Sequence, residues 1–151
     1  ITRFLDVIAE VNEETALDGL TWFFDHAETI SEENMQRLKA LGGGIAIQHR
    51  MAYQGESFIQ RYGQKPALAS PPVKRMLELG IPVGLGTDGT RVASYNLWVA
   101  LYWSTTGKTI GGNQVMAQQN ALDRTTALRL ATHKGYELIK EENKGKIESG
   151  Y

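Results

Sequence analysis

The sequence predicts an α/β fold in which helices alternate with the strands of a parallel sheet. Three short apolar segments, 20–24, 45–47 and 81–85, are rich in residues that favour strands, and polar residues follow each of them. The segments between them carry apolar residues at helical spacing. Strands that alternate with helices in this way are typical of βα units around a parallel sheet.

Composition and charge narrow the class of protein. The 151 residues are 42% hydrophobic and 22% charged, as in an ordinary globular domain, and the formal net charge of −1 gives no strong field for nucleic acid or an anionic membrane. The absence of cysteine excludes disulfides and thiol catalysis. No apolar run reaches the roughly 20 residues needed to cross a bilayer. We therefore expect one cytoplasmic unit over 1–151 that binds neither nucleic acid nor membrane.

The N-terminal segment predicts a helix, a strand and a second helix. An amphipathic helix that covers the sheet is indicated by apolar residues at helical spacing, namely Phe4, Val7, Ile8 and Val11. The strand over 20–24 is expected to be buried and to end at Asp25 and His26. Ser31 is the expected N-cap of the second helix, and the glycines of 42–44 end it.

The segment between the second and third apolar runs is less regular. We expect a short helix from Glu56 to Tyr62 and a further short strand near Ala67 and Leu68. The pair Pro71–Pro72 favours a helix start, because the fixed φ and missing N–H of proline are tolerated in a first turn. Gly80 ends that helix.

Beyond the last apolar run the sequence predicts two more helices. The first is expected to pack in the core through an aromatic stripe, Tyr95, Trp98 and Tyr102. Trp103 lies on another face and could line a substrate pocket. Asp123 is expected to cap a long helix with inward residues Leu128, Ala131, Gly135 and Leu138. His133, in the middle of that helix, is expected at the surface.

Polar residues at the strand ends form the candidate site. His26, His49 and Asp88 each follow a strand, and the carboxyl ends of parallel strands share the rim at which α/β folds bind ligands. Imidazole and carboxylate are zinc ligands, and zinc lowers the pKa of a bound water to about 7. We predict that all three bind a metal and that Asp88 also moves the proton from the attacking water to the leaving group. Taken singly, each has an alternative as a capping or turn residue.

Four segments together resemble the amidohydrolase superfamily, in particular its amidohydrolase-3 (YtcJ-like) type. They are 25–28, 44–51, 80–88 and 145–150. The resemblance covers essentially the whole chain and implies a metal-dependent hydrolase on a (β/α)8 barrel. Such a barrel takes about 250 residues. The resemblance therefore implies that 1–151 is the C-terminal half of the barrel, strands five to eight with their helices, without the β-sandwich domain of relatives.

The resemblance also assigns roles to the three candidate ligands. His26 corresponds to the fifth-strand ligand, His49 to the sixth-strand ligand and Asp88 to the eighth-strand aspartate that binds metal and acts as the catalytic base. The implied cofactor is a divalent metal, with zinc expected, as one or two ions in the complete enzyme. The implied reaction is hydrolysis of C–N or related bonds of a small molecule. The strand-one His-x-His pair and the strand-four lysine or glutamate of relatives are missing, so we expect metal binding by the chain alone to be weak or absent.

The sixth-strand assignment leaves alternatives open. Many relatives carry their histidine a few residues after the position of His49, where this chain has Met51. Gln48 and Arg50 are therefore alternative residues that face the pocket, because side chains alternate along a strand. Arg50 and Arg91 are candidates for holding an anionic or carbonyl group of the substrate.

The sequence is also compatible with two other functions. The glycines of 84–89 match the G-x-G-x-x-G pattern of nucleotide-binding proteins, but 89–122 contains no Asp or Glu to hold a ribose. A non-catalytic fragment or assembly module is the other alternative, since a half-barrel has open strand edges. We therefore expect the chain to pair with a second copy or with a missing N-terminal half-barrel.

Overall fold

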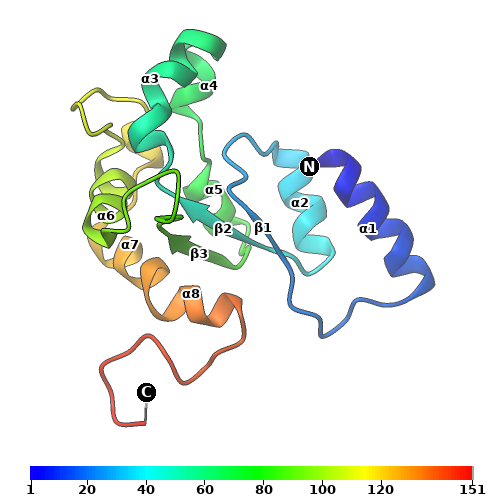
Figure 1. Cartoon of the computed structure of the whole chain (residues 1–151). Helices are drawn as coiled ribbons and strands as arrows, with labels where there is room; N and C mark the ends of the chain where they lie inside the picture. Colours follow the sequence, from blue (N-terminus) through cyan, green and yellow to red (C-terminus); the bar gives the residue numbers. More distant parts are fainter. Residues whose placement is uncertain (151) are drawn as a thin grey trace.

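A three-stranded parallel sheet lies at the centre of the computed structural model, which describes residues 1–150 (Figure 1). Its strands are β1 (Phe23–Asp25), β2 (Gly44–Gln48) and β3 (Val83–Gly86), in the order β1-β2-β3. In the register, Phe24 lies opposite Ile45, and Ile47 lies opposite Leu85. All three strands therefore end at the same edge of the sheet. This confirms the predicted mixed α/β architecture.

Eight α-helices and one 3₁₀ helix form within the described residues. They are α1 (Thr2–Glu14), α2 (Glu32–Ala40), α3 (Met51–Tyr62), α4 (Gln64–Leu68), α5 (Val73–Glu78), α6 (Leu97–Thr106), η1 (Gln118–Asn120), α7 (Arg124–Ala131) and α8 (His133–Leu138). Figure 1 shows α1 and α2 on one side of the sheet and α6 and α7 on the other. None of these helices is long and apolar enough to cross a membrane.

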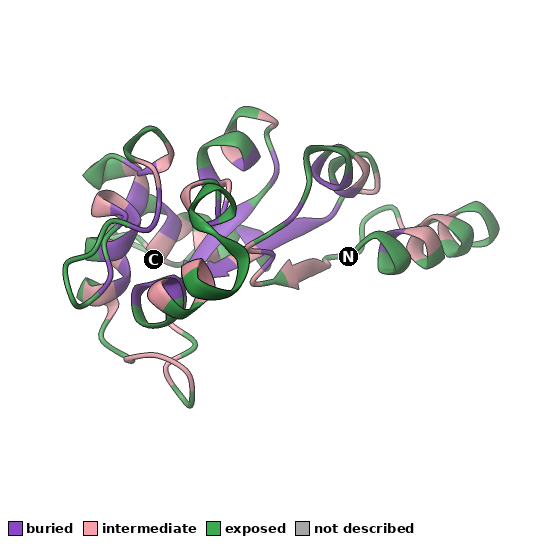
Figure 2. Cartoon of the chain, turned by 90° about the horizontal axis from the view of Figure 1, so that it is seen from above, coloured by how far each residue is buried: buried purple, intermediate pink, exposed green. Residues whose placement is uncertain are grey.

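Two apolar clusters hold these elements together. The larger cluster packs β2 and β3 against α2, α5 and α7 through fully or nearly fully buried side chains, among them Leu38, Ile45, Ile47, Met76, Leu85 and Ala127. The smaller cluster joins α3 to α6 through Met51, Ala52, Trp103, Met116 and Ala121. Figure 2 shows the buried residues concentrated in the sheet and its flanking helices, while α1 projects from one side.

The first helix forms as predicted but does not cover the sheet with the predicted face. Phe4, Val7 and Val11 are exposed, and Leu5 is the residue of α1 that is buried. The helix packs mainly on α2, where an ion pair of 2.6 Å joins Arg37 to Asp6. The apolar spacing correctly predicts a helix. The contact with α2 determines which of its side chains is buried, and that side chain is Leu5.

Several local predictions around β1 and β2 are confirmed. The Oγ atom of Ser31 accepts a hydrogen bond of 3.3 Å from the backbone N of Asn34, which makes Ser31 the N-cap of α2. The helix expected from Glu56 to Tyr62 is present and begins earlier, at Met51. The first strand is shorter than expected, and the predicted full burial is wrong, since Phe23 and Phe24 are only partly buried and Asp25 is exposed.

The strand expected near Ala67 and Leu68 is wrong, since both residues belong to α4. Neither residue is β-branched, and Pro66 has the backbone φ of a helix already fixed. The Oγ atom of Ser70 closes the turn by donating to the carbonyl oxygen of Pro66 over 2.7 Å. With no strand in this segment, β2 pairs directly with β3.

The aromatic stripe predicted to pack in the core, which consists of Tyr95 before α6 and Trp98 and Tyr102 within it, faces outward instead. Tyr95, Trp98 and Tyr102 are exposed, whereas Trp103 is fully buried against Met116 and does not line a pocket. The segment 97–103 is apolar on nearly every side, so helical spacing alone did not select its inner face.

The long helix expected after Asp123 is two helices. Asp123 caps α7, since its Oδ1 atom accepts a hydrogen bond of 2.9 Å from the backbone N of Thr126. The helix breaks at Thr132, whose φ of −123° and ψ of −115° are not helical. Leu128, predicted inward, is 48% exposed. His133 opens α8 and is partly buried.

Candidate functional site

The structure brings two of the three predicted metal ligands together at the edge where the strands end. His26 directly follows β1, and Asp88 lies two residues beyond β3. The Nε2 atom of His26 is 3.7 Å from the Oδ2 atom of Asp88. Their side chains are 33% and 35% exposed, so both remain accessible to a ligand.

The backbone of both residues is in a conformation that side chains rarely adopt. The φ angles are 70° at His26, 54° at Ala27 and 46° at Asp88, all in the left-handed region. Within residues 1–150, Lys140 is the only other non-glycine residue with a positive φ. At His26 the backbone N still donates to the carbonyl oxygen of Ala46 over 2.9 Å, so the chain turns sharply as soon as the strand pairing ends. Unusual backbone at two converging strand ends is typical of functional sites.

Glu28 joins this pair, although the sequence analysis did not single it out. Its Oε1 atom lies 3.4 Å from the Nδ1 atom of His26. Both atoms are buried, and neither has a hydrogen-bond partner within the described part of the chain. A carboxylate beside one nitrogen of a histidine is the usual means of directing the other nitrogen toward a metal. The spacing His-x-Glu was the available sequence signal.

His49 is placed differently from the other two predicted ligands. It directly follows β2 but is fully buried, and its ring centroid lies 5.6 Å from that of Tyr53. Burial lowers the pKa of His49 below the ordinary value of 6.5, and a weaker interaction with the backbone of Gly86 acts in the opposite direction. Neither ring nitrogen has a hydrogen-bond partner of ordinary geometry in residues 1–150. His49 is therefore a side chain of the packed interior in this structure.

The His26 and Asp88 pair fits two positions around one divalent cation. Zinc bonds to imidazole nitrogen and carboxylate oxygen of about 2.0–2.2 Å in a tetrahedron place two ligand atoms roughly 3.4 Å apart. The observed 3.7 Å is close to that separation. No group of three or more His, Cys, Asp or Glu side chains suited to a metal occurs in the described residues. The chain thus presents two suitable donors, and a third ligand remains a prediction.

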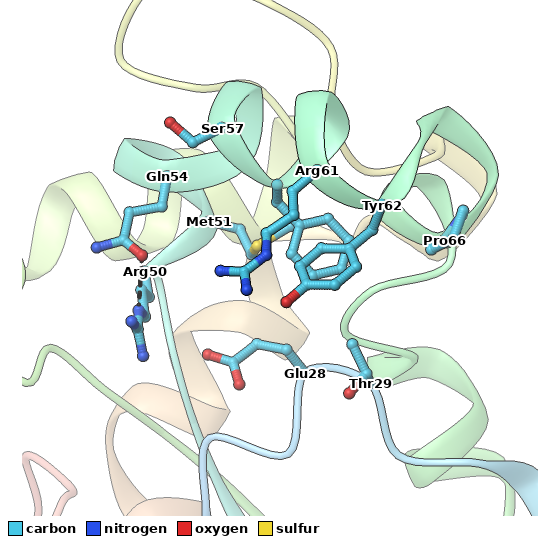
Figure 3. A pocket seen from close by; sticks show the side chains of 10 residues that line it. Glu28, Thr29, Arg50, Met51, Gln54, Ser57, Arg61, Tyr62 and Pro66 are labelled. Atoms are coloured by element: carbon cyan, nitrogen blue, oxygen red, sulfur yellow. Dashed lines mark hydrogen bonds between the residues drawn. The ribbon is translucent and has the colours of Figure 1, made fainter.

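A cleft of about 670 Å³ opens beside Glu28, the residue whose carboxylate contacts His26 (Figure 3). It is lined by Glu28, Thr29, Arg50, Met51, Gln54, Ser57, Phe58, Arg61, Tyr62 and Pro66. Most of these residues belong to α3, and Glu28 connects the cleft to His26. The volume is in the range of about 300–1,000 Å³ that is typical of small-molecule sites.

The three predicted substrate-binding residues have different positions relative to this cleft. Arg50 lines it, and its Nε atom donates to Oε1 of Gln54 over 3.0 Å. Gln48 is 8% exposed and its buried Oε1 atom has no hydrogen-bond partner within residues 1–150. Arg91 is exposed in the loop after β3 and does not line the cleft. Arg61 and Tyr62, which the sequence analysis missed as site residues, do line it.

The whole chain, residues 1–151, matches the family model described as the amidohydrolase family. The chain belongs to this family. The predicted resemblance is therefore confirmed, and the amidohydrolase family is one of hydrolase enzymes. The nucleotide-binding alternative requires a helix directly after the glycines of 84–89. The next helix begins only at Leu97, so the structure does not support this alternative.

Two curated relatives are similar in sequence to this amidohydrolase chain. The chain is 32% identical over 130 residues to a 5-methylthioadenosine/S-adenosylhomocysteine deaminase from Dictyoglomus thermophilum, and 31% identical to the same kind of enzyme from Dictyoglomus turgidum. Each alignment covers 83% of this chain and 26% of the relative. The chain thus spans about a quarter of the length of these relatives.

The amidohydrolase chain also shares its fold with solved structures. A metal-dependent hydrolase from Pyrococcus horikoshii superposes with a TM-score of 0.75 at 21% identity, over 97% of this chain and 30% of that one. A metal-dependent hydrolase from Pyrococcus furiosus gives a TM-score of 0.73 at 22% identity, over 97% and 29%. The three-stranded sheet and its helices therefore form a fold that occurs as part of larger hydrolases.

Proposed function

We propose that this chain is part of a metal-dependent hydrolase that cleaves a C–N bond of a small molecule. The observation that carries the proposal is the 3.7 Å approach of His26 Nε2 to Asp88 Oδ2 at the strand ends of an amidohydrolase-family chain. The two curated relatives are deaminases, whose reaction replaces an amino group by the oxygen of water. The cleft that Glu28 connects to His26 is large enough for a small-molecule substrate.

The strand order supports a revised place in a (β/α)8 barrel. Consecutive strands are hydrogen-bonded neighbours in such a barrel, and here β1 pairs with β2 and β2 with β3. If Asp88 ends the eighth strand, His49 follows the seventh and His26 follows the sixth. The expected assignment to strands five, six and eight needed a strand near Ala67, which is helical. We therefore propose that the chain supplies strands six to eight.

This order gives the two imidazoles different roles. His26 and Asp88 are the proposed metal ligands, on strands that carry ligands in relatives. His49 follows a strand to which the family resemblance assigns no ligand, and its complete burial agrees with a packing role. The other ligands implied by the resemblance would come from strands one, four and five. A preceding part of the barrel is therefore the proposed partner of these residues.

The residues of this chain would perform distinct parts of the reaction. A bound divalent cation, with zinc the proposed ion, supplies Lewis acidity that lowers the pKa of a water to about 7. Asp88 is exposed enough to accept a proton from the attacking water and return it to the leaving nitrogen. Glu28 holds the ring of His26, and Arg50 contacts the substrate in the cleft.

Zinc titration of the chain tests the proposal, using calorimetry together with the NMR signals of the histidine rings. We expect weak saturable binding that shifts the signals of His26, and a loss of roughly tenfold or more in affinity in His26→Ala and Asp88→Asn. His133→Ala is the matched control, because His133 lies on α8 and is not part of the pair. Unchanged zinc affinity in both ligand variants would show that the assignment is wrong.

A further inference from the structure

Two arginines, Arg50 directly before α3 and Arg61 within it, line the cleft without a carboxylate partner. Arg50 and Arg61 both line it, and no ion pair involves either of them within residues 1–150. Arg50 donates through Nε to the neutral amide of Gln54, which leaves its other N–H groups available. Figure 3 shows Arg61 pointing into the cleft. The α3 side of the cleft is therefore cationic and has unused hydrogen-bond donors.

The same side of the cleft also has an aromatic wall. The rings of Phe58 and Tyr62 lie 4.8 Å apart between centroids, and the Arg61 guanidinium lies 5.3 Å from the Tyr62 centroid. Phe58, Tyr62 and the neighbouring Met51 all line the cleft. Stacking on Tyr62 restricts the guanidinium plane, which favours planar, bidentate contacts with an anion. An occupant would therefore meet apolar surface and cationic donors together.

Glu28 makes the two ends of the cleft differ in charge. Figure 3 shows its carboxylate on the side opposite Arg61 and Tyr62, and its Oε1 atom faces the Nδ1 atom of His26. The end of the cleft nearest His26 is therefore negative, and the α3 end is positive. A substrate with an anionic group is repelled by Glu28 and attracted by the arginines, so its anionic end lies away from His26 and Asp88.

We propose that this cleft binds the anionic end of an amphipathic substrate, with Arg61 and Arg50 as specificity-determining residues. The substrate class is a small molecule with an apolar or aromatic body and a carboxylate or phosphate. The proposal rests on the proposed function, since it takes His26 and Asp88 as the reacting end. The cleft itself binds the anion with or without a metal, so the two proposals are tested separately.

Benzoate, phenyl phosphate and benzyl alcohol are the probes, titrated into the chain without metal. The NMR signals of the arginine Nε–H groups report binding, and calorimetry gives the affinity. We expect benzoate or phenyl phosphate to shift the Arg61 and Arg50 signals and to bind roughly tenfold more tightly than neutral benzyl alcohol, since two charge-assisted contacts are lost. Whichever anion binds more tightly supports the proposal and identifies the anionic group.

Variants of exposed arginines complete the test. Arg61→Met should weaken binding of the preferred anion roughly tenfold, and Arg61→Lys should restore only part of it, because lysine keeps the charge without the planar fork. Arg3→Met on α1 is the matched control and should bind like the wild type. Circular dichroism checks that each variant is folded.

Two results would overturn the proposal. One is equal affinity for the anions and for benzyl alcohol, including no saturable binding of any probe. The other is anion binding that persists unchanged in Arg61→Met and Arg50→Met. If the chain binds zinc through His26 but fails this test, only the proposed anion site is wrong. If the chain passes this test but binds no zinc, the proposed metal-dependent function is wrong and the anion site is supported.

Discussion

The Oε1 atom of Glu28 lies 3.4 Å from the Nδ1 atom of His26, while the Nε2 atom of the same ring faces Asp88. Glu28 is only two residues further along the chain than His26. Its side chain returns to the imidazole because His26 and Ala27 both have left-handed backbone, with φ of 70° and 54°. The carboxylate favours the tautomer with the proton on Nδ1, which leaves the Nε2 lone pair directed toward the proposed metal position.

Replacing Glu28 should therefore change the state of the His26 ring. In Glu28→Ala we expect the ring to lose its preference for a proton on Nδ1, and zinc affinity to fall roughly tenfold, because outer-shell partners orient metal ligands. Glu28→Gln should keep part of both properties, since the amide oxygen still accepts a hydrogen bond. Long-range ¹H–¹⁵N NMR of the His26 ring reports the tautomer, and zinc titration reports the affinity.

The matched control for this prediction is Glu13→Gln. Glu13 is an exposed residue of α1, so its replacement removes one negative charge without touching His26. We expect no change in the tautomer or in zinc affinity for this variant. If Glu28→Ala matched the control in both measurements, the contact between Glu28 and His26 would have no orienting role.

Glu56 on α3 forms hydrogen bonds with the loop after α6, and the stability that these bonds contribute should depend on pH. Its Oε1 atom accepts hydrogen bonds of 2.5 Å from Thr109 Oγ1 and 2.9 Å from Asn113 Nδ2. These bonds, that from Thr109 first, hold the pKa of Glu56 below its ordinary value of 4.5. The folded protein thus binds a proton at Glu56 less readily than the unfolded chain does. The stabilisation is complete above 4.5 and is lost as the pH falls through the folded-state pKa.

Glu56→Gln isolates this contribution to stability. We expect the variant to be less stable than the wild type by about 1 kcal/mol near neutral pH, since bonds to a charged group are replaced by bonds to a neutral one. The difference should shrink at a pH well below 4.5. Urea unfolding followed by circular dichroism at both pH values measures it. A difference that stayed constant with pH would mean that the charge on Glu56 makes no contribution.

Features of the site that depend on the strand pattern could be predicted from sequence. His26 and Asp88 follow apolar runs, and parallel strands bring such ends together, which the 3.7 Å contact bears out. The His-x-Glu spacing marks Glu28 as a candidate, but its contact with His26 could not be predicted, because the contact depends on left-handed backbone at Ala27 that the local sequence does not require. The burial of His49 could not be predicted either, since it results from the packing of α3, which begins at Met51, two residues later.

Which face of α6 is buried could not be predicted from sequence either. The two tryptophans of α6 provide a direct test of how this helix packs. Trp98 is 74% exposed and Trp103 is fully buried, although both lie on one nearly uniformly apolar helix. Trp103→Ala should lower the free energy of unfolding by about 3–5 kcal/mol, as for large core residues. Trp98→Ala should change it by less than about 0.5 kcal/mol. Urea unfolding measures both, and a larger loss in Trp98→Ala would mean that α6 is rotated from its position here.

A substitution at Gly44 tests how closely α8 and the residue before β3 approach the start of β2. A Cβ atom at this position would clash with Cδ1 of Leu138 and lie 3.0 Å from the carbonyl oxygen of Pro82. Leu138 could move, but the Pro82 oxygen accepts the 2.9 Å bond from Ile45 N and cannot retreat without weakening the strand pair. Gly44→Ala should therefore lower stability by about 1–3 kcal/mol, as overpacking does. Gly86→Ala is the matched strand control, because nothing lies within 4 Å of its Cβ position, and we expect a change below about 0.5 kcal/mol. Equal losses of thermal stability in the two variants would mean that the close approach at Gly44 is not part of the folded state.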